Sequence, residues 1–222
     1  MPQIASCEEL RREYDLRFSA MLDYRVAVWK VLTADFFQKF VPECAAVLDL
    51  GCGWGEFINH IRAAQKYGMD LNPESRNKLT GAVEFYQQDC SARWPLADGS
   101  LDVVFTSNFL EHLLNKEMLR ATIVEIHRCL KPGGRIIAMG PNIRFLPGAY
   151  WDFWDHHVAL TDRSLCELFT LEGFKIARCH PRFLPYTMAH GSRPPLFFLK
   201  AYLKLRLLWP LLGRQFLVVG KK

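Results

Sequence analysis

The chain has 222 residues, half of them hydrophobic, so it is long enough for one domain with a sizeable core and too apolar to be disordered. Its seven cysteines are odd in number and include no Cys-x-x-Cys pair, which argues against a disulfide framework or a zinc site and for reduced thiols in the cytoplasm. Because the N-terminus lacks a basic region followed by an apolar run, no secretory signal is predicted.

The formal net charge of +5 is unevenly distributed. Residues 1–172 contain 18 Lys and Arg against 23 Asp and Glu, a net charge of −5, whereas residues 173–222 contain ten Lys and Arg and no acid. This asymmetry indicates that the C-terminal part meets an anionic partner, such as a phosphorylated substrate, a nucleic acid or a lipid surface. The alternative is that these cations only flank an apolar helix and stay solvated.

Residues 6–40 are predicted to be helical, because Ser6 and Glu9 fit a capping box and apolar residues then recur at helical spacing until Pro42 ends the region. We assign residues 1–44 to a helical cap or lid. Its candidate contacts with a cofactor and substrate are Tyr14, Arg17, Tyr24, Arg25 and Trp29. The alternative is an amphipathic segment that simply packs against the rest of the domain.

In the remainder, 45–222, short apolar runs alternate with helical stretches, which implies parallel βαβ units. The predicted strands are 45–50, 66–69, 83–87, 101–106, 135–139, 174–179 and a closing strand at 215–220. The predicted helices are 56–64, a short one from Pro73, 118–130 and one that Thr161 caps. An apolar, basic segment occupies 194–212.

The most informative segment, Val47-Leu-Asp-Leu-Gly-Cys-Gly-Trp-Gly55, places three glycines directly after a buried strand. Glycine is needed where the chain turns tightly and a ligand approaches the backbone. The spacing Gly-x-Gly-x-Gly differs from the Gly-x-Gly-x-x-Gly of dinucleotide-binding proteins, and Asp49 beside the loop would repel a pyrophosphate. A ligand with an ammonium or sulfonium group has no such conflict. The alternative is a tight turn that binds no ligand.

Acidic residues also close the next two predicted strands. Asp70 stands where a carboxylate can accept hydrogen bonds from both hydroxyls of a ribose. Asp89 could accept from the exocyclic amine of an adenine while Cys90 donates its backbone N–H. Singly, each Asp is more often a turn residue or helix cap. Three acids at successive strand ends, however, would open on the same crevice.

From Val47 to Lys222 the chain resembles the class I, Rossmann-like methyltransferases that use S-adenosylmethionine, and in particular their small-molecule group. The resemblance rests on the residues above and on the runs Asp98–Leu113 and Leu130–Ile137. It implies an α/β three-layer sandwich with a seven-stranded, mostly parallel sheet whose last strand, near Phe216–Gly220, is antiparallel. It places these residues around the cofactor: Asp49, Gly51, Cys52, Gly53, Gly55, Asp70, Leu71, Asp89, Cys90, Asn108 and Phe109.

One departure from the family bears on the substrate. Members that methylate base amines or glutamine amides carry an Asn/Asp-Pro-Pro-aromatic tetrad after the fourth strand, whereas this chain has Asn108-Phe-Leu-Glu111. We therefore expect in-line O-methylation of a small-molecule, saccharide or lipid-linked acceptor, since similar methyltransferases often accompany cell-surface glycan assembly. The alternatives are RNA or protein methylation, although no RNA-binding module is present and nucleic acid is disfavoured, and a non-catalytic regulator that binds S-adenosylmethionine.

Two segments carry candidates for a general base, the loop 150–157 after the fifth predicted strand and the pair Glu111-His112, because a hydroxyl acceptor benefits from a group that takes its proton near neutral pH. We predict His156 or His157 as the base, with Asp152 or Asp155 orienting it. Alternatively, His157 only packs against the following helix, and His112 is expected to line the floor of the pocket. These four loop residues are of metal-binding types, but their spacing is not diagnostic, so no metal site is predicted.

The segment 195–212 contains no acid, and Lys200 and Lys204 share one helical face while apolar side chains occupy most of the rest. Its cations and Pro210 make it a poor membrane-spanning helix, but it suits a helix lying in a membrane interface or covering the substrate pocket. We expect a cytoplasmic enzyme that meets the inner face of the membrane through residues 194–212. The alternative is packing on the domain or in a dimer interface, and the sequence does not define the oligomeric state.

Overall fold

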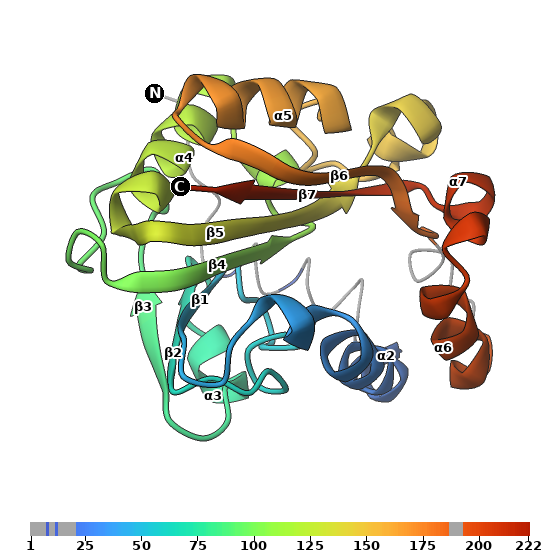
Figure 1. The fold of residues 1–222 in the computed structure, drawn as a ribbon, viewed down its shortest axis with the longest axis horizontal. Helices are drawn as coiled ribbons and strands as arrows, with labels where there is room; N and C mark the ends of the chain where they lie inside the picture. Colours follow the sequence, from blue (N-terminus) through green and yellow to red (C-terminus); the bar gives the residue numbers. More distant parts are fainter. Residues whose placement is uncertain (1–7, 9–11, 13–20, 187–192) are drawn as a thin grey trace.

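The computed structural model describes residues 8, 12, 21–186 and 193–222 (Figure 1). Seven strands form one sheet in the order β3-β2-β1-β4-β5-β7-β6. Only β7 runs antiparallel to its neighbours β5 and β6, and the other paired strands are parallel. The strands are β1 (Ala46–Leu50), β2 (Gln65–Asp70), β3 (Val83–Gln87), β4 (Leu101–Ser107), β5 (Leu130–Pro141), β6 (Lys175–Leu184) and β7 (Gln215–Lys221). The predicted sheet with an antiparallel last strand is confirmed.

Helices cover both faces of the sheet, which completes the three-layer sandwich (Figure 1). One face carries α4 (Lys116–Cys129) and α5 (Asp162–Leu171), and the other carries α2 (Leu22–Asp35), η2 (Phe37–Phe40), α6 (Leu196–Lys204) and α7 (Trp209–Leu212). The remaining short helices are α3 (Ser75–Lys78), η3 (Leu110–His112), η4 (Ile143–Phe145), η5 (Ala149–Asp152) and η7 (Arg206–Leu208). Every residue of β1 is buried because successive side chains enter the two separate cores.

The N-terminal helical region packs on the sheet through an aromatic cluster. Trp29 of α2 is buried, with its ring 6.0 Å from that of Phe105 in β4, and Phe57 stacks on the same ring at 3.7 Å. The helical region ends at Phe40, before Pro42, as predicted. The predicted capping box at Ser6 lies outside the described residues, as do the lid candidates Tyr14 and Arg17.

The helix predicted at 56–64 is wrong, because this segment forms a series of turns. Two N–H groups, of Asn59 and Ile61, still donate to the carbonyl four residues back, at 2.9 and 3.1 Å. The N–H of Ile58 donates to Oδ2 of Asp49 at 3.3 Å, as a carboxylate accepts at a helix N-terminus. The carbonyl oxygen of Glu56 accepts from Nδ1 of His60 at 2.7 Å, in place of the backbone N–H four residues on.

The structure also defines where β5 and α5 begin. The fifth strand is longer than predicted, since α4 ends at Cys129 and β5 begins at once with Leu130 paired to Leu101. Thr161 caps α5 as predicted, and its hydroxyl accepts from the N–H of Ser164 at 2.9 Å in a capping box.

Candidate cofactor site and histidine cluster

The predicted cofactor residues lie at one edge of the sheet. Strands β1 to β4 are parallel, so their carboxyl ends point the same way. The glycine loop 51–55 follows β1, Asp70 ends β2, Asp89 lies just past β3 and Asn108 follows β4. This is the edge at which open α/β sheets bind ligands.

The glycine loop needs its glycines for backbone conformation and for space. Gly51, Gly53 and Gly55 have φ values of 67°, 50° and 76°, in the left-handed region that side chains with a Cβ rarely adopt. A Cβ atom at Gly51 would also overlap ring atoms of Phe109. The N–H groups of Gly51 and Cys52 both donate to the carbonyl of Met69, at 2.9 and 3.1 Å, which fixes the loop against the end of β2.

Asp70 braces the same loop directly. Its Oδ2 accepts from the N–H of Gly53 at 2.8 Å, and its Oδ1 accepts from the N–H of Asn72 at 2.9 Å. Each carboxylate oxygen can accept a further hydrogen bond, so the predicted contact with ribose hydroxyls is compatible with this geometry. Leu71, the next residue, is half-buried.

Three acidic side chains, of Asp49, Glu56 and Asp70, gather beside the loop. Burial raises the pKa of Asp49 well above its usual range, and the charges of Glu56 and Asp70 raise it further. Burial is also the main cause that raises the pKa of Asp70, and burial with these three acids raises the pKa of the Cys52 thiol. Nε of Arg25, from α2, donates to Glu56 at 3.0 Å. This arrangement favours a cationic ligand such as a sulfonium or an ammonium.

The predicted adenine contacts form a compact turn. Oδ1 of Asp89 accepts from both the backbone N–H and the hydroxyl of Ser91, each at 2.8 Å. The Cys90 thiol is buried beside the hydroxyl of Thr122 at 3.3 Å. Asp89 therefore has the turn role given above as its alternative, and its contact with an adenine stays a prediction.

Asn108 combines a strained backbone with an unsatisfied side-chain oxygen. Its φ of 49° is the only positive value of a residue other than glycine in the described part of the chain. Its Nδ2 donates to the hydroxyl of Ser107 at 3.0 Å, but its buried Oδ1 has no hydrogen-bond partner within the described ranges. Strained and unsatisfied groups of this kind concentrate at ligand sites.

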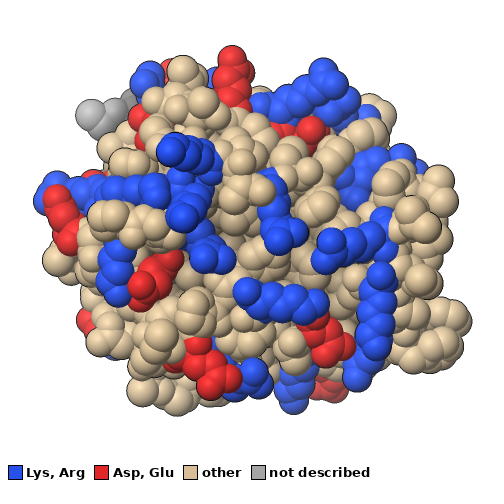
Figure 2. All heavy atoms as spheres, viewed as in Figure 1, with Lys and Arg blue, Asp and Glu red and all other residues tan. Residues whose placement is uncertain are grey.

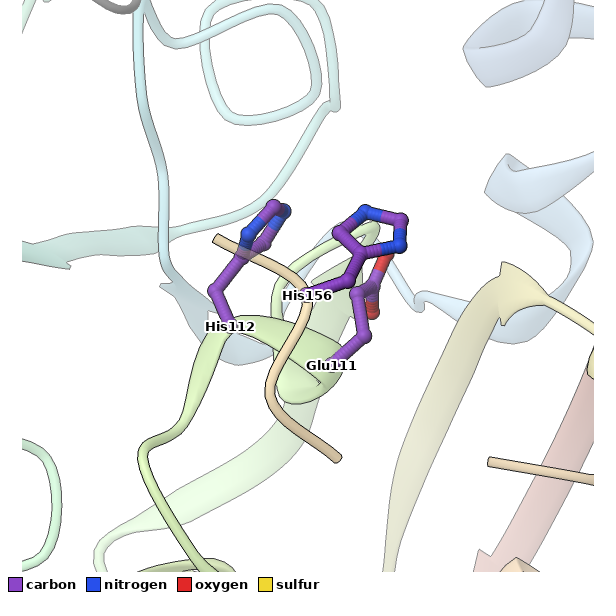
Figure 3. Close-up of side chains that lie close together, drawn as sticks. All are labelled: Glu111, His112 and His156. Atoms are coloured by element: carbon purple, nitrogen blue, oxygen red, sulfur yellow. The ribbon is translucent and has the colours of Figure 1, made fainter. Parts of the chain in front are cut away.

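A second group of side chains gathers next to Asn108 (Figure 3). Glu111 and His112 come from η3, whereas His156 comes from the loop between β5 and α5. Each offers a metal-ligating atom, and these atoms all lie within 4.8 Å of one another. Two backbone N–H groups, of His157 and Val158, donate to the carbonyl of Glu111 at 2.9 and 3.1 Å and join the two segments.

The four predicted catalytic residues differ in how far they are buried and in what they contact. His156 is buried and stacks on Phe153, whereas His157 and Asp152 are exposed. Oδ2 of Asp155 pairs with Nδ1 of His112 at 2.9 Å, and the expectation that Asp155 orients His156 or His157 stays a prediction. That pairing was not predicted, since the two residues are far apart in the sequence.

Glu111 was a candidate base in the sequence, as part of the Glu111-His112 pair directly after the strand end at Asn108, but it was not the preferred one. Its side chain is buried, and burial together with the charge of Asp155 raises its pKa to about 7, although His112 opposes the shift. A carboxyl group with this pKa can exchange a proton near neutral pH.

The acid-free C-terminal region forms a basic cleft and an apolar surface. The cleft, of about 350 Å³, is lined by cations with no acid among its described residues: Lys39, Arg135, Arg178, Arg206 and Lys221. Figure 2 shows Lys and Arg side chains spread widely over one face of the molecule.

The large exposed apolar side chains between 194 and 212 are Phe197, Phe198, Leu205, Leu207, Leu211 and Leu212. Within the described residues, no helix has the length and apolar character to cross a membrane.

Comparisons with known proteins agree with this geometry. Residues 48–138 match the family model described as "Methyltransferase domain". A "Probable S-adenosylmethionine-dependent methyltransferase" of Mycolicibacterium smegmatis is 28% identical over 148 residues, which are 63% of this chain and 56% of that protein. A "Probable tocopherol O-methyltransferase, chloroplastic" of rice is 29% identical over 136 residues, covering 54% of this chain and 36% of that protein. The chain therefore spans about half or less of these relatives.

The fold has a close counterpart among solved structures. A SAM-dependent methyltransferase from Archaeoglobus fulgidus superposes with a TM-score of 0.70 and 19% identity, covering 92% of this chain and 99% of that one. The family model, these relatives and the fold all support the predicted resemblance to the class I, Rossmann-like S-adenosylmethionine-dependent methyltransferases. The predicted family and its cofactor, S-adenosylmethionine with S-adenosylhomocysteine as product, are confirmed.

Proposed function

We propose that the chain transfers the methyl group of S-adenosylmethionine to an oxygen atom of a small-molecule, saccharide or lipid-linked acceptor. The observation that carries this proposal is the left-handed glycine loop flanked by Asp49, Glu56 and Asp70, because it combines close backbone approach with acidic side chains. The cofactor supplies a methyl group on a positively charged sulfur, which leaves as a neutral thioether. The chain's own task is to hold donor and acceptor in line.

An oxygen acceptor agrees with the groups around the expected transfer site. A hydroxyl must lose its proton as the new carbon–oxygen bond forms, and His157, the other predicted base in the loop after β5, is exposed and of a residue type that can take it. The tetrad typical of amide and base-amine methylation is absent after β4, where Asn108 and Phe109 stand instead. The rice relative is named as a probable tocopherol O-methyltransferase.

Contact with a membrane surface is part of the proposal. One side of α6 is anchored, since the hydroxyl of Tyr202 donates to the carbonyl of Phe183 at 2.7 Å. Near the start of α6, Phe197 and Phe198 are 62% and 56% exposed, and Leu207 in η7 is 88% exposed. Apolar side chains beside exposed cations suit insertion into a lipid headgroup layer.

Flotation with liposomes tests this membrane contact. We expect the chain to float with vesicles that contain anionic lipid, and Phe197→Ser with Leu207→Ser to abolish flotation. Exchange of the exposed Leu171 for Ser serves as the control, because this side chain is 69% exposed but lies on α5. If the unmodified chain stays in the pellet with both anionic and neutral vesicles, the membrane contact is refuted.

Transfer of a labelled methyl group tests the reaction. The purified chain is incubated with methyl-labelled cofactor and with separate pools of lipid-linked saccharides, free saccharides, RNA and protein. We expect label in a saccharide or lipid-linked pool, as an ether that resists mild base. Label in RNA or protein would replace the proposed acceptor, and absence of label from every pool despite cofactor binding would indicate a regulator.

A further inference from the structure

We propose that Glu111, His112 and His156 bind one divalent transition-metal ion at the acceptor side of the cofactor crevice (Figure 3). The sequence predicted no metal site, and of the four loop residues first weighed as ligands only His156 belongs to this one. The site unites two segments that the chain separates by α4 and β5.

The ligand set matches a known coordination chemistry. Two imidazole nitrogens and one carboxylate oxygen bind zinc, iron(II) or manganese(II), and three protein ligands leave positions open for water or an acceptor. Ligand atoms about 2.1 Å from a zinc ion lie about 3.4 Å apart in a tetrahedron. The ligand atoms of Glu111, His112 and His156 lie within 4.8 Å of one another. Rotation of the side chains can bring them to the shorter separation that a zinc ion needs.

Glu111 provides an independent sign of a missing partner. Its side chain is only 1% exposed, and Oε1 is buried without a hydrogen-bond partner in the described part of the chain. Buried carboxylate oxygens are rarely left unsatisfied, because they have lost their contacts with water. A metal ion between Glu111 and the two imidazoles would supply the missing contact.

The surroundings hold the two histidines as metal ligands are commonly held. Oδ2 of Asp155 lies 2.9 Å from Nδ1 of His112, which fixes the ring and leaves Nε2 as its ligating atom. The ring of His156 stacks on Phe153 at 5.0 Å and 22°, and meets Tyr150 edge-on at 4.9 Å. Both rings therefore have support besides the proposed ion.

The position of the site suggests its use. Asn108 and Phe109 directly precede η3, and Phe109 lies against Gly51 of the cofactor loop. A hydroxyl bound to an ion here would be more acidic and would be placed beside the cofactor. This role rests on the proposed function, whereas metal binding itself does not.

Equilibrium dialysis tests the proposal. The folded chain is first treated with a chelator and is then dialysed against Zn²⁺ or Mn²⁺ in the absence of cofactor and acceptor. Bound metal is measured by mass spectrometry, and Co²⁺ spectra separate nitrogen and oxygen ligands from thiolates such as the exposed Cys44 and Cys179. We expect one equivalent of one of these ions per chain. Glu111→Gln and His156→Ala should each lower the affinity at least tenfold, and Asp155→Asn about 10- to 100-fold.

His127→Gln is the matched control, because His127 is half-buried against Phe174 and lies outside the cluster. It should keep full metal binding. If Glu111→Gln fails to fold, by circular dichroism, His112→Gln replaces it, since His112 is more exposed. Absence of bound Zn²⁺ and Mn²⁺, or binding that all ligand substitutions leave unchanged, would overturn the proposal. Methyl transfer by the chelator-treated chain would refute only the role of the ion in the reaction, and metal binding without transfer would refute only the proposed function.

Discussion

The two sides of the crevice are built in different ways. The cofactor side is made of backbone, from a loop of left-handed glycines that one strand-end carboxylate braces through the N–H of Gly53. The other side is made of side chains, where Glu111 and His112 meet His156 from a distant segment. The first kind of site leaves a contiguous pattern in the sequence. The second depends on tertiary packing and leaves almost none.

The largest effect should come from Gly51→Ala. The new Cβ would overlap Phe109 and would need a left-handed backbone, so we expect a loss of about 4 kcal/mol of stability and no binding of S-adenosylhomocysteine. Chemical denaturation and calorimetry measure both. Gly81→Ala is the control, because its φ is 69° but no atom lies within 4 Å of the new Cβ. Equal losses in the two variants would show that the contact with Phe109 is unimportant.

Arg25→Met should cost about 3 kcal/mol of stability. The side chains of Arg25 and Glu56 are 13% and 9% exposed, so the substitution leaves a buried carboxylate without its cation. Arg62→Met should cost less than about 1 kcal/mol, since Arg62 and Glu43 are 67% and 69% exposed. Urea denaturation of both variants provides the comparison. A cost for Arg25→Met no greater than that for Arg62→Met would contradict the importance of this buried pair.

Asp70→Ala should weaken the binding of S-adenosylhomocysteine by about 1–3 kcal/mol, because it removes the hydrogen bond to Gly53 and those expected to the ribose. Titration calorimetry measures the affinity. Asp98→Ala is the control, because Asp98 is exposed and outside the crevice. Unchanged affinity in Asp70→Ala would argue strongly against the assigned ribose contact.

The smallest effect concerns pH. Because the folded-state pKa of Asp49 is raised, the folded chain holds this proton more tightly than the unfolded chain. The contribution of Asp49 to stability is therefore fully present below its unfolded pKa, about 4, and is lost as pH rises through the folded pKa. Relative to Asp49→Asn, the unmodified chain should gain stability as pH falls from 7 to 5, by no more than about 1.4 kcal/mol per pH unit. Parallel stability profiles would refute this shift.

The features that could be predicted from the sequence are those that depend on neighbouring residues alone. Apolar runs located the seven strands, and Thr161 with its helix was evident from capping chemistry. The sequence could not predict the turns at 56–64, where the carbonyl oxygen of Glu56 accepts from the side chain of His60 and not from its backbone N–H. Nor could it pair Asp155 with His112, since that contact exists only once η3 and the loop after β5 are packed together.

Calorimetric titration of the purified, folded chain with S-adenosylhomocysteine tests the central claim most directly, namely that the glycine loop and its carboxylates bind the cofactor. We expect saturable heat that fits one site per chain. A folded sample that gives no heat with this compound or with S-adenosylmethionine would contradict the account.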